Sequence, residues 1–386
     1  MKIISLVGAR PNFMKIAPFI KAIDKLNSEL RTSNSELIKH LLVHTGQHYD
    51  DRMSRTFFEE LEIPDADINL GIGSGSHAEQ VGQTMIAFEK VLQQENPDWV
   101  IVVGDVNATL AGSVTAKKEH IKCAHIEAGL RSGDITMPEE INRLVTDRLS
   151  DLLFTPDHIS GENLRKEGAE EGRIKFVGNI MIDTLEANRQ KAEEFTIDRI
   201  IHNNLLFDRK FSIPENNNFA VVTLHRPSNV DHIEIFRPIT QFIKGTVSKD
   251  MPVIWPVHPR AIKQMELFGL WDDMKNTEGV ILLYPLGYHE MLRLNMGARV
   301  FLTDSGGLQE ECTILGTPCL TLRWNTERPV TLREHGGASV LVGNNIGLLK
   351  NEYHNTLNLK RNPVRPELWD GKTADRIVNA LIQYKI

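Results

Sequence analysis

The chain has 386 residues, more than the roughly 100–200 of an average domain, so its length predicts two domains. Its composition, with 41% hydrophobic and 25% charged residues, excludes a disordered or collagen-like protein. The 44 basic and 51 acidic side chains give a net charge of −7, which argues against a general nucleic-acid surface. Uncharged apolar runs stay well short of the roughly 20 residues that span a bilayer, so we expect no membrane partner.

Short apolar runs alternate with longer helical patterns through the first half of the chain, which predicts parallel α/β layers. The predicted strands are 3–7, 38–43, 99–103, 123–126, 152–155 and 175–177, and the predicted helices include 15–26, 80–94 and 139–150. The first run is only about six residues long and ends in Gly8-Ala9-Arg10-Pro11, so it indicates a buried strand rather than a signal peptide.

The strand pattern then restarts, after a polar stretch at 186–218 that we interpret as helix plus linker. The second series of predicted strands is 219–224, 253–257, 280–283, 300–303 and 319–322, and a last helix is predicted at 373–384. The fold class is therefore α/β with two Rossmann-like, doubly wound domains, at 1–178 and 179–365. A ligand between them would meet the carboxyl ends of both sheets.

Three cysteines give a hint of the compartment. Cys123, Cys312 and Cys319 cannot all pair and form no CxxC motif, so they are predicted to be reduced core residues of a cytoplasmic protein.

Four predicted strands run directly into polar clusters, at residues 8–15, 104–109, 127–131 and 304–307. A single charged residue after a strand is usually just solvated. Because the carboxyl ends of parallel strands form one edge of a sheet, four such clusters predict a polar active cleft.

Two of these clusters are suited to anions. Arg10 and Lys15 flank the start of a helix whose first position is Pro11, although a plain turn with two surface cations would look the same. In Asp304-Ser305-Gly306-Gly307, the glycines allow a phosphate to approach the backbone, and Ser305 can cap the helix or donate to an oxygen. Glu311, one turn later, could accept hydrogen bonds from ribose hydroxyls; the alternative is a capped helix with an acidic face.

Carboxylates and histidines complete the candidate site. Asp105 and Glu127 each follow an apolar strand, where a carboxylate is costly unless it is paired or useful. Glu139 and Arg143 lie four apart on one helix face, which a surface ion pair would also explain.

His225 and His258 follow successive strands, although a lone histidine is usually structural. His125-x-Glu127 lacks the CxxC partner of a zinc deaminase, and HExxH is absent, so no metal is expected.

Taken together, these motifs resemble the non-hydrolysing UDP-N-acetylglucosamine 2-epimerases over most of the chain. The matching segments are GARP at 8–11, HTGQH at 44–48, GD at 104–105, HIEAGLR at 125–131, PEEINR at 138–143, HR at 225–226, TDSGGLQEE at 303–311 and TERP at 326–329. Each segment alone is modest evidence for the family, whereas the order and spacing of all the segments together are specific to it.

The resemblance implies a glycosyltransferase-B-like fold, in which two Rossmann-like domains close on a UDP-sugar and a C-terminal helix at about 366–386 packs back onto the first domain. It implies a homodimer and no cofactor. The implied reaction is reversible C2 epimerisation of UDP-N-acetylglucosamine to UDP-N-acetylmannosamine, for surface polysaccharide precursors. UDP is eliminated to give 2-acetamidoglucal and then adds back.

The resemblance also implies roles for individual residues. The catalytic residues map onto Asp105, Glu127, Glu139, Lys15 and His225. The substrate-binding residues map onto Arg10, Arg143, Ser305, Gly306, Gly307, Glu311 and Arg328. An allosteric UDP-sugar site of some members maps onto Gln47, His48 and His258. The chain departs from the common pattern in segment 73–77, at Met291, where a ring often stacks on uracil, and at Val330.

Several alternatives stay open. An epimerase for UDP-2,3-diacetamido-2,3-dideoxyglucuronate has a similar segment at 44–64. A hydrolysing relative would release free N-acetylmannosamine, a glycosyltransferase would share the fold and UDP site but need an acceptor, and a UDP-sugar sensor would need no carboxylates. The sequence does not decide the C3 and C6 substituents, the activator, or which carboxylate is the base in each direction.

Overall fold

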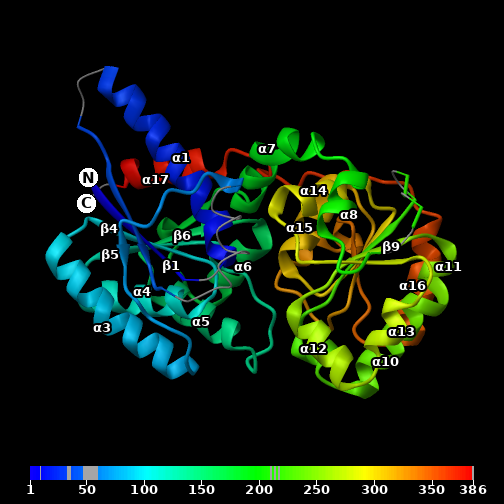
Figure 1. Cartoon of the computed structure of the whole chain (residues 1–386). Helices are drawn as coiled ribbons and strands as arrows, with labels where there is room; N and C mark the ends of the chain where they lie inside the picture. The colour runs from blue at the N-terminus through cyan, green and yellow to red at the C-terminus, as the bar shows by residue number, and fades with distance from the viewer. Residues whose placement is uncertain are drawn as a thin grey trace. The chain divides into compact units, whose positions relative to one another are not determined.

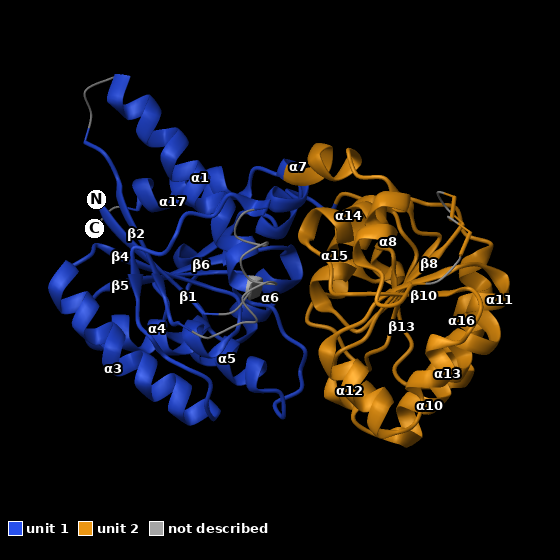
Figure 2. Cartoon of the chain, viewed as in Figure 1, with its two compact units in different colours: residues 1–187, 366–386 blue, residues 188–365 orange. Residues whose placement is uncertain are grey.

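The computed structural model describes residues 1–8, 10–32, 36–46, 60–208, 211–212, 214–215 and 218–384. The chain divides into two compact units (Figure 2). Unit 1 comprises Met1–Ala187 and Pro366–Ile386, and unit 2 comprises Asn188–Arg365. Within the described ranges, no helix combines the length and the apolar character needed to cross a bilayer.

Unit 1 is built on a parallel sheet that has, among its described residues, the strand order β3-β2-β1-β4-β5-β6-β7. These strands are β1 (Lys2–Val7), β2 (Lys39–His44), β3 (Ile68–Asn69), β4 (Trp99–Val103), β5 (Lys122–Ile126), β6 (Leu152–Thr155) and β7 (Ile174–Phe176). The order reverses between β1 and β4, which pair in parallel from Ile3 opposite Trp99 onward. Every residue of β4 is buried, as expected for a sheet covered on both faces.

Helices flank this sheet (Figure 1). They are α1 (Arg10–Thr32), α3 (His77–Glu95), α4 (Asn107–Lys118), α5 (Pro138–Leu149), α6 (His158–Lys166), the start of α7 (Ile180–Glu193) and α17 (Thr373–Gln383). The C-terminal helix α17 packs against α1, and the two are joined by an ion pair between Lys25 and Asp375. Asp183 of α7 accepts the backbone N–H groups of Thr373 and Ala374, which satisfies the first donors of α17.

Unit 2 repeats the design with a parallel sheet ordered β10-β9-β8-β11-β12-β13 within the described residues. Its strands are β8 (Ala220–Thr223), β9 (Val253–Pro256), β10 (Val280–Leu283), β11 (Val300–Thr303), β12 (Cys319–Thr321) and β13 (Ser339–Leu341). Ala220 and Val222 pack into one apolar cluster and Val221 into another, so successive side chains of β8 enter the cores on opposite faces.

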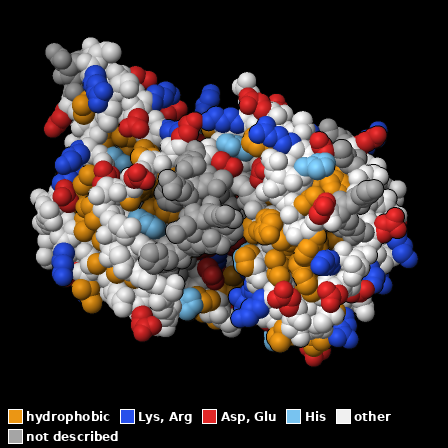
Figure 3. Space-filling model, in the orientation of Figure 1, with side chains coloured by type: hydrophobic (Ala, Val, Ile, Leu, Met, Phe, Trp, Pro, Cys, Tyr) orange, Lys and Arg blue, Asp and Glu red, His pale blue; other side chains and the backbone are white. Residues whose placement is uncertain are grey.

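The helices of unit 2 lie on both faces of its sheet (Figure 1). They are α8 (Ile197–Asn204), α9 (Pro227–Val230), α10 (Ile233–Phe242), α11 (Ser248–Asp250), α12 (Pro259–Leu267), α13 (Trp271–Lys275), α14 (Tyr288–Gly297), α15 (Gly306–Leu315) and α16 (Ile346–Leu357). On the face drawn in Figure 3, acidic and basic side chains are interspersed over both units.

The predicted strands are confirmed to within about two residues at each end, and the predicted helices are present. The short strands β3 and β13 were not predicted. The division between units falls after Ala187, inside α7, and not at residue 178. The first turns of α7 belong to unit 1 because Thr184 donates to the carbonyl of Met14 and Asp183 holds α17. At Gly178 the backbone instead passes close to another segment of unit 1, since a Cβ atom there would lie 2.1 Å from the carbonyl oxygen of Leu368.

Candidate active site

In unit 1 the predicted site residues gather where the strand order reverses. Asn12 joins the two strand ends there, because the backbone N–H of Gly8 donates to its Oδ1 (3.1 Å) and its Nδ2 donates to the carbonyl of Val103 (2.7 Å). Gly104 has a φ of +67°, and a Cβ atom there would lie 2.9 Å from Lys15 Nζ. Glycine therefore gives Lys15 room beside the end of β4.

Lys15 and Glu127 form a buried ion pair between Nζ and Oε2, and both side chains are at most 6% exposed. Lys15 comes from the first turns of α1, and Glu127 directly follows β5. Glu127 has a φ of +72°, a left-handed conformation that is costly for a residue with a side chain. Such strain points to a role for the residue, because it persists only where the surroundings enforce it.

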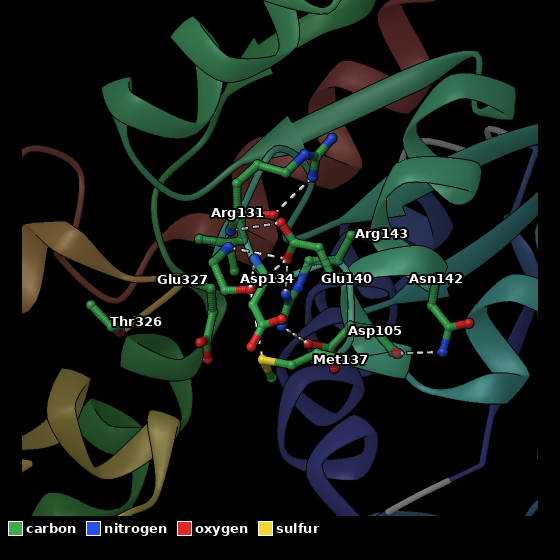
Figure 4. Close-up of polar contacts among 12 residues, drawn as sticks. Asp105, Arg131, Asp134, Met137, Glu140, Asn142, Arg143, Thr326 and Glu327 are labelled. Atoms are coloured by element: carbon green, nitrogen blue, oxygen red, sulfur yellow. Dashed lines mark hydrogen bonds and ion pairs between the residues drawn. The ribbon is translucent and has the colours of Figure 1, made fainter. Parts of the chain in front are cut away.

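Asp105 is held by the helix α5 (Figure 4). Arg143 Nη2 lies 2.5 Å from Asp105 Oδ2, and Arg143 Nη1 lies 2.5 Å from Glu140 Oε2. Asn142 Nδ2 donates to the backbone carbonyl of Asp105 at 2.8 Å. The Arg143 side chain is 3% exposed and that of Asp105 is 24% exposed. Arg143 is thus no member of a surface ion pair, and Asp105 keeps access to solvent.

Glu140 anchors this arrangement. Its carboxylate accepts the backbone N–H groups of Ser132 and Gly133 and the Ser132 hydroxyl, each at 3.0 Å. Burial alone would raise the pKa of Glu140, but these hydrogen bonds and the Arg143 charge outweigh it and lower the pKa. Glu140 therefore stays ionised beside Arg143.

Glu139 lies in the first turn of α5 and shares a cavity of about 190 Å³ with Asp105. The cavity belongs to unit 1 and is lined by Gly8, Thr45, Ile72, His77, Gln80, Thr84, Asp105, Val106, Asn107, Ala108, Pro138, Glu139 and Asn142. The structure therefore brings together Asp105, Glu127, Glu139, Lys15 and Arg143 at one edge of the unit 1 sheet.

In unit 2 the corresponding strand ends hold a histidine against a buried carboxylate. His225 Nδ1 lies 2.7 Å from Asp304 Oδ1, with the histidine side chain 42% exposed and the aspartate side chain fully buried. Asp304 also accepts the backbone N–H of Arg226 at 2.9 Å and Asn229 Nδ2 at 3.1 Å. Burial would raise the pKa of Asp304, but His225 and these donors outweigh it and lower the pKa. The hydrogen on His225 therefore resides on Nδ1, and Nε2 is left to act as an acceptor or, when protonated, a donor.

The glycine turn of unit 2 lies over a buried group of charges. Ser305 stands at the N-cap position of α15, but its side chain makes no capping hydrogen bond. A Cβ atom at Gly306 would lie 2.7 Å from Glu327 Oε1 and 3.0 Å from Arg328 Nη1. Arg328 Nε in turn lies 2.8 Å from Glu310 Oε1. Arg328 is thus brought to the turn, as part of a buried ion-pair cluster.

The remaining predicted residues fall in different places. Glu311 is buried in α15, where desolvation raises its pKa to about 7 against hydrogen bonds from Tyr288 and Asn295. His258 caps α12 by accepting the backbone N–H of Arg260, and its ring centre lies 5.6 Å from that of His225. Gln47, His48 and the side chain of Arg10 lie outside the described residues.

Sequence reasoning gave no role to several residues that organise these sites. Asn12, Glu140 and Asp304 lie inside motifs that were already singled out, so their position was visible and their function was not. Asp147, which binds His125 and Arg131, lies four residues after Arg143 on α5, a helical spacing that could have placed it on the same face.

Two Rossmann-like domains with polar groups at both reversal points define an α/β protein of the glycosyltransferase-B type, and this predicted fold class is confirmed. Residues 30–382 match the family model described as UDP-N-acetylglucosamine 2-epimerase. The chain therefore belongs to the UDP-N-acetylglucosamine 2-epimerase family, a family of isomerases, as its motifs predicted.

Individual relatives agree with this assignment. The chain is 42% identical over 382 residues to the UDP-N-acetylglucosamine 2-epimerase of Methanocaldococcus jannaschii, covering 99% of both chains. It is 38% identical over 347 residues to the UDP-2,3-diacetamido-2,3-dideoxy-D-glucuronate 2-epimerase of Pseudomonas aeruginosa, covering 89% and 88%. A crystal structure of the M. jannaschii enzyme in complex with UDP-GlcNAc and UDP matches all of both chains with a TM-score of 0.87.

Proposed function

We propose that this protein interconverts UDP-N-acetylglucosamine and UDP-N-acetylmannosamine by eliminating UDP and adding it back. Family membership supports the reaction type, and the M. jannaschii relative supports the substrate. The observation that carries the proposal is the pair of carboxylates at neighbouring strand ends of unit 1. Asp105 follows β4 and Glu127 follows β5, and each is bound to a buried cation.

The chemistry explains why more than one carboxylate is needed. The hydrogen on C2 of the sugar is weakly acidic, because no adjacent carbonyl stabilises a carbanion. The electron pair of the C2–H bond must therefore form a C1–C2 double bond as the C1–O bond to UDP breaks, which yields 2-acetamidoglucal. Re-addition with a proton delivered to the opposite face of C2 gives the epimer. Asp105, Glu127 and Glu139 are the candidates for these proton transfers.

The departing UDP needs positive charge and N–H donors. In unit 2 we assign this role to His225, Arg328 and the turn from Ser305 to Gly307, at the start of α15. In unit 1, Lys15 and Arg143 are engaged by Glu127 and Asp105. We assign them first to holding these carboxylates, with the diphosphate as their second partner. The electron balance is complete without an oxidant, so no cofactor is needed.

We extend the proposal to a homodimer in the cytoplasm that supplies a precursor for surface polysaccharide. Family resemblance supports the dimer and the pathway class. Cys123, Cys312 and Cys319 are buried and free, which suits a reducing compartment.

A second substrate is favoured by one specific observation. The P. aeruginosa relative, at 38% identity, acts on a diacetamido glucuronate sugar, and the identity to the M. jannaschii relative is only slightly higher at 42%. The same elimination would serve both sugars, since they differ at C3 and C6 and not at the reacting carbons.

The test is to incubate the purified protein with each UDP-sugar alone and to follow the products by NMR. We expect UDP-N-acetylmannosamine from UDP-N-acetylglucosamine, with free UDP as a minor species. Turnover of the diacetamido glucuronate sugar alone would favour the second substrate. Equal accumulation of UDP and free N-acetylmannosamine would indicate a hydrolase, and binding without turnover of either sugar would overturn the proposal.

A further inference from the structure

We propose that the buried ion pair between His125 and Asp147 positions Asp105 and Glu127 for proton transfer. The inference rests on the proposed function, because it assigns a role relative to those carboxylates. His125 lies in β5 and Asp147 on α5, and both side chains are at most 2% exposed. Neither was assigned to the site from the sequence, where His125 begins the matching segment 125–131 and makes only a weak metal ligand.

His125 makes a contact on each side of its ring. Nδ1 lies 2.6 Å from Asp147 Oδ1, and Nε2 lies 2.7 Å from the carbonyl oxygen of Gly104. A carbonyl oxygen can only accept, and an ionised carboxylate can only accept, so both ring nitrogens carry hydrogen. His125 is therefore a buried cation with no nitrogen left for a metal.

The charge on Asp147 is also stabilised by a second cation, Arg131. Burial would raise its pKa, but His125 and Arg131 outweigh this effect and lower it. Arg131 Nη2 lies 2.8 Å from Asp147 Oδ2 and 2.7 Å from Glu167 Oε2. The four residues form a chain of alternating charges that is compensated within unit 1.

His125 and Asp147 contact backbone groups next to both predicted carboxylates, just before Asp105 and just after Glu127. Gly104, which His125 holds through its carbonyl, directly precedes Asp105. The backbone N–H of Gly129, two residues after Glu127, donates to Asp147 Oδ2 at 3.0 Å. Gly129 itself has a φ of +82°, so the turn that carries Glu127 is fixed at both ends, by His125 before it and Gly129 after it.

The same pair fixes the helix that contributes the third carboxylate. Asp147 lies on α5, four residues after Arg143 and two turns after Glu139, and its side chain reaches the strand β5. The ends of β4 and β5 and the helix α5 are therefore tied at one buried point. A network of charges in a low-dielectric interior is stiff, and a displacement of about 1 Å at reacting groups can cost about a hundredfold in rate.

Asp151 provides a matched control, because it contacts the same strand, β5, as Asp147. It lies just after α5, binds Lys117 Nζ at 2.8 Å, and accepts the backbone N–H of Cys123 at 2.8 Å. Like Asp147 it joins an ion pair to a backbone donor, but it does so at the amino end of β5. A substitution there perturbs the strand without touching the turns that carry Asp105 and Glu127.

The experiment compares Asp147→Asn, His125→Gln and Asp151→Asn in the full chain, at a temperature where all are folded. We expect kcat for epimerisation to fall about a hundredfold in the first two variants and to stay within about twofold in Asp151→Asn. KM for UDP-N-acetylglucosamine and the affinity for UDP should change by less than about threefold in all three. Equal losses in Asp147→Asn and Asp151→Asn, or wild-type kcat in Asp147→Asn, would overturn the inference.

A measurement on the unmodified protein covers the case in which a variant fails to fold. With ¹⁵N-labelled histidine, both ring nitrogens of His125 should show the shifts of nitrogens that carry hydrogen, with the signal assigned by its loss in His125→Gln. A neutral ring would overturn the ion pair. This readout needs no turnover, so a protein without epimerase activity would refute the proposed function while the pair is still tested.

Discussion

The two units share one topology and use it for opposite purposes. In each sheet the strand order reverses once, between β1 and β4 in unit 1 and between β8 and β11 in unit 2. At the first reversal, buried cations hold carboxylates, and the side chain of Asp105 is 24% exposed whereas that of its partner Arg143 is 3% exposed. At the second, the buried carboxylate of Asp304 holds His225, which is 42% exposed.

This inversion explains how one fold supplies two kinds of chemistry. Unit 1 presents carboxylates that are held by buried cations, which suits the transfer of protons. Unit 2 presents an imidazole that is held by a buried carboxylate, together with the backbone N–H groups at the start of α15, which suits the binding of an anion. Substitutions of the unit 1 carboxylates should therefore affect mainly kcat, and those at the glycine turn of unit 2 mainly the affinity for UDP.

The largest effect is expected from the carboxylates of unit 1. Asp105→Asn, Glu127→Gln and Glu139→Gln should each lower kcat by at least about a hundredfold, the usual contribution of a positioned acid or base, and leave UDP binding intact. Glu62→Gln, which removes an exposed partner of Lys21 on α1, is the control and should retain activity. Two of the three variants turning over like the wild type would refute the assignment.

The glycine turn of unit 2 should control affinity. Gly306→Ala would drive a methyl group against Glu327 and Arg328, and Gly307→Val would add a branched side chain at the turn where we propose that the phosphate binds. We therefore expect about tenfold or greater loss of UDP affinity by calorimetry. Gly245→Ala, where an added Cβ meets nothing within 4 Å, is the matched control. Unchanged UDP affinity in folded Gly306→Ala would remove the turn from the site.

A smaller effect should follow from loosening His225. Asp304→Asn keeps the size of the side chain but loses the charge that fixes the imidazole, so kcat should fall about tenfold. His225→Asn should lose at least as much, and the double variant should lose little more than His225→Asn alone. Additive losses would show that Asp304 does not act through His225.

The pH dependence of stability gives a last test, which leaves turnover out of the measurement. Burial raises the pKa of Glu311 from 4.5 to about 7, so the folded chain binds this proton more tightly than the unfolded chain. The stability that results is complete below pH 4.5 and is lost as the pH rises through 7. Glu311→Gln resembles the neutral form, so both proteins should be similarly stable at pH 5, and the wild type should be less stable by up to about 3 kcal/mol at pH 8.5. Calorimetric unfolding without UDP checks this, and a difference that does not vary with pH would contradict it.

Much of the fold was readable from local pattern, because buried parallel strands are short apolar runs that end in glycine and polar residues. Glu127 and Asp304 were placed correctly at strand ends for this reason. The partners of these residues were not readable, since Lys15 and Glu127 are separated by 112 positions and their contact depends on packing. The division of the two units inside α7 depends likewise on packing, since Thr184 and Asp183 bind the first turns of this helix to distant residues of unit 1.

The most direct measurement of the central claim is hydrogen exchange at C2 during turnover. The protein is incubated with UDP-N-acetylglucosamine alone in D₂O, and both epimers are examined by NMR. Elimination and re-addition remove the C2 proton and return one from an acid that exchanges with solvent, so both sugars should become deuterated at C2, with UDP and the glycal as minor species. Epimerisation with the C2 protium fully retained would contradict the elimination mechanism.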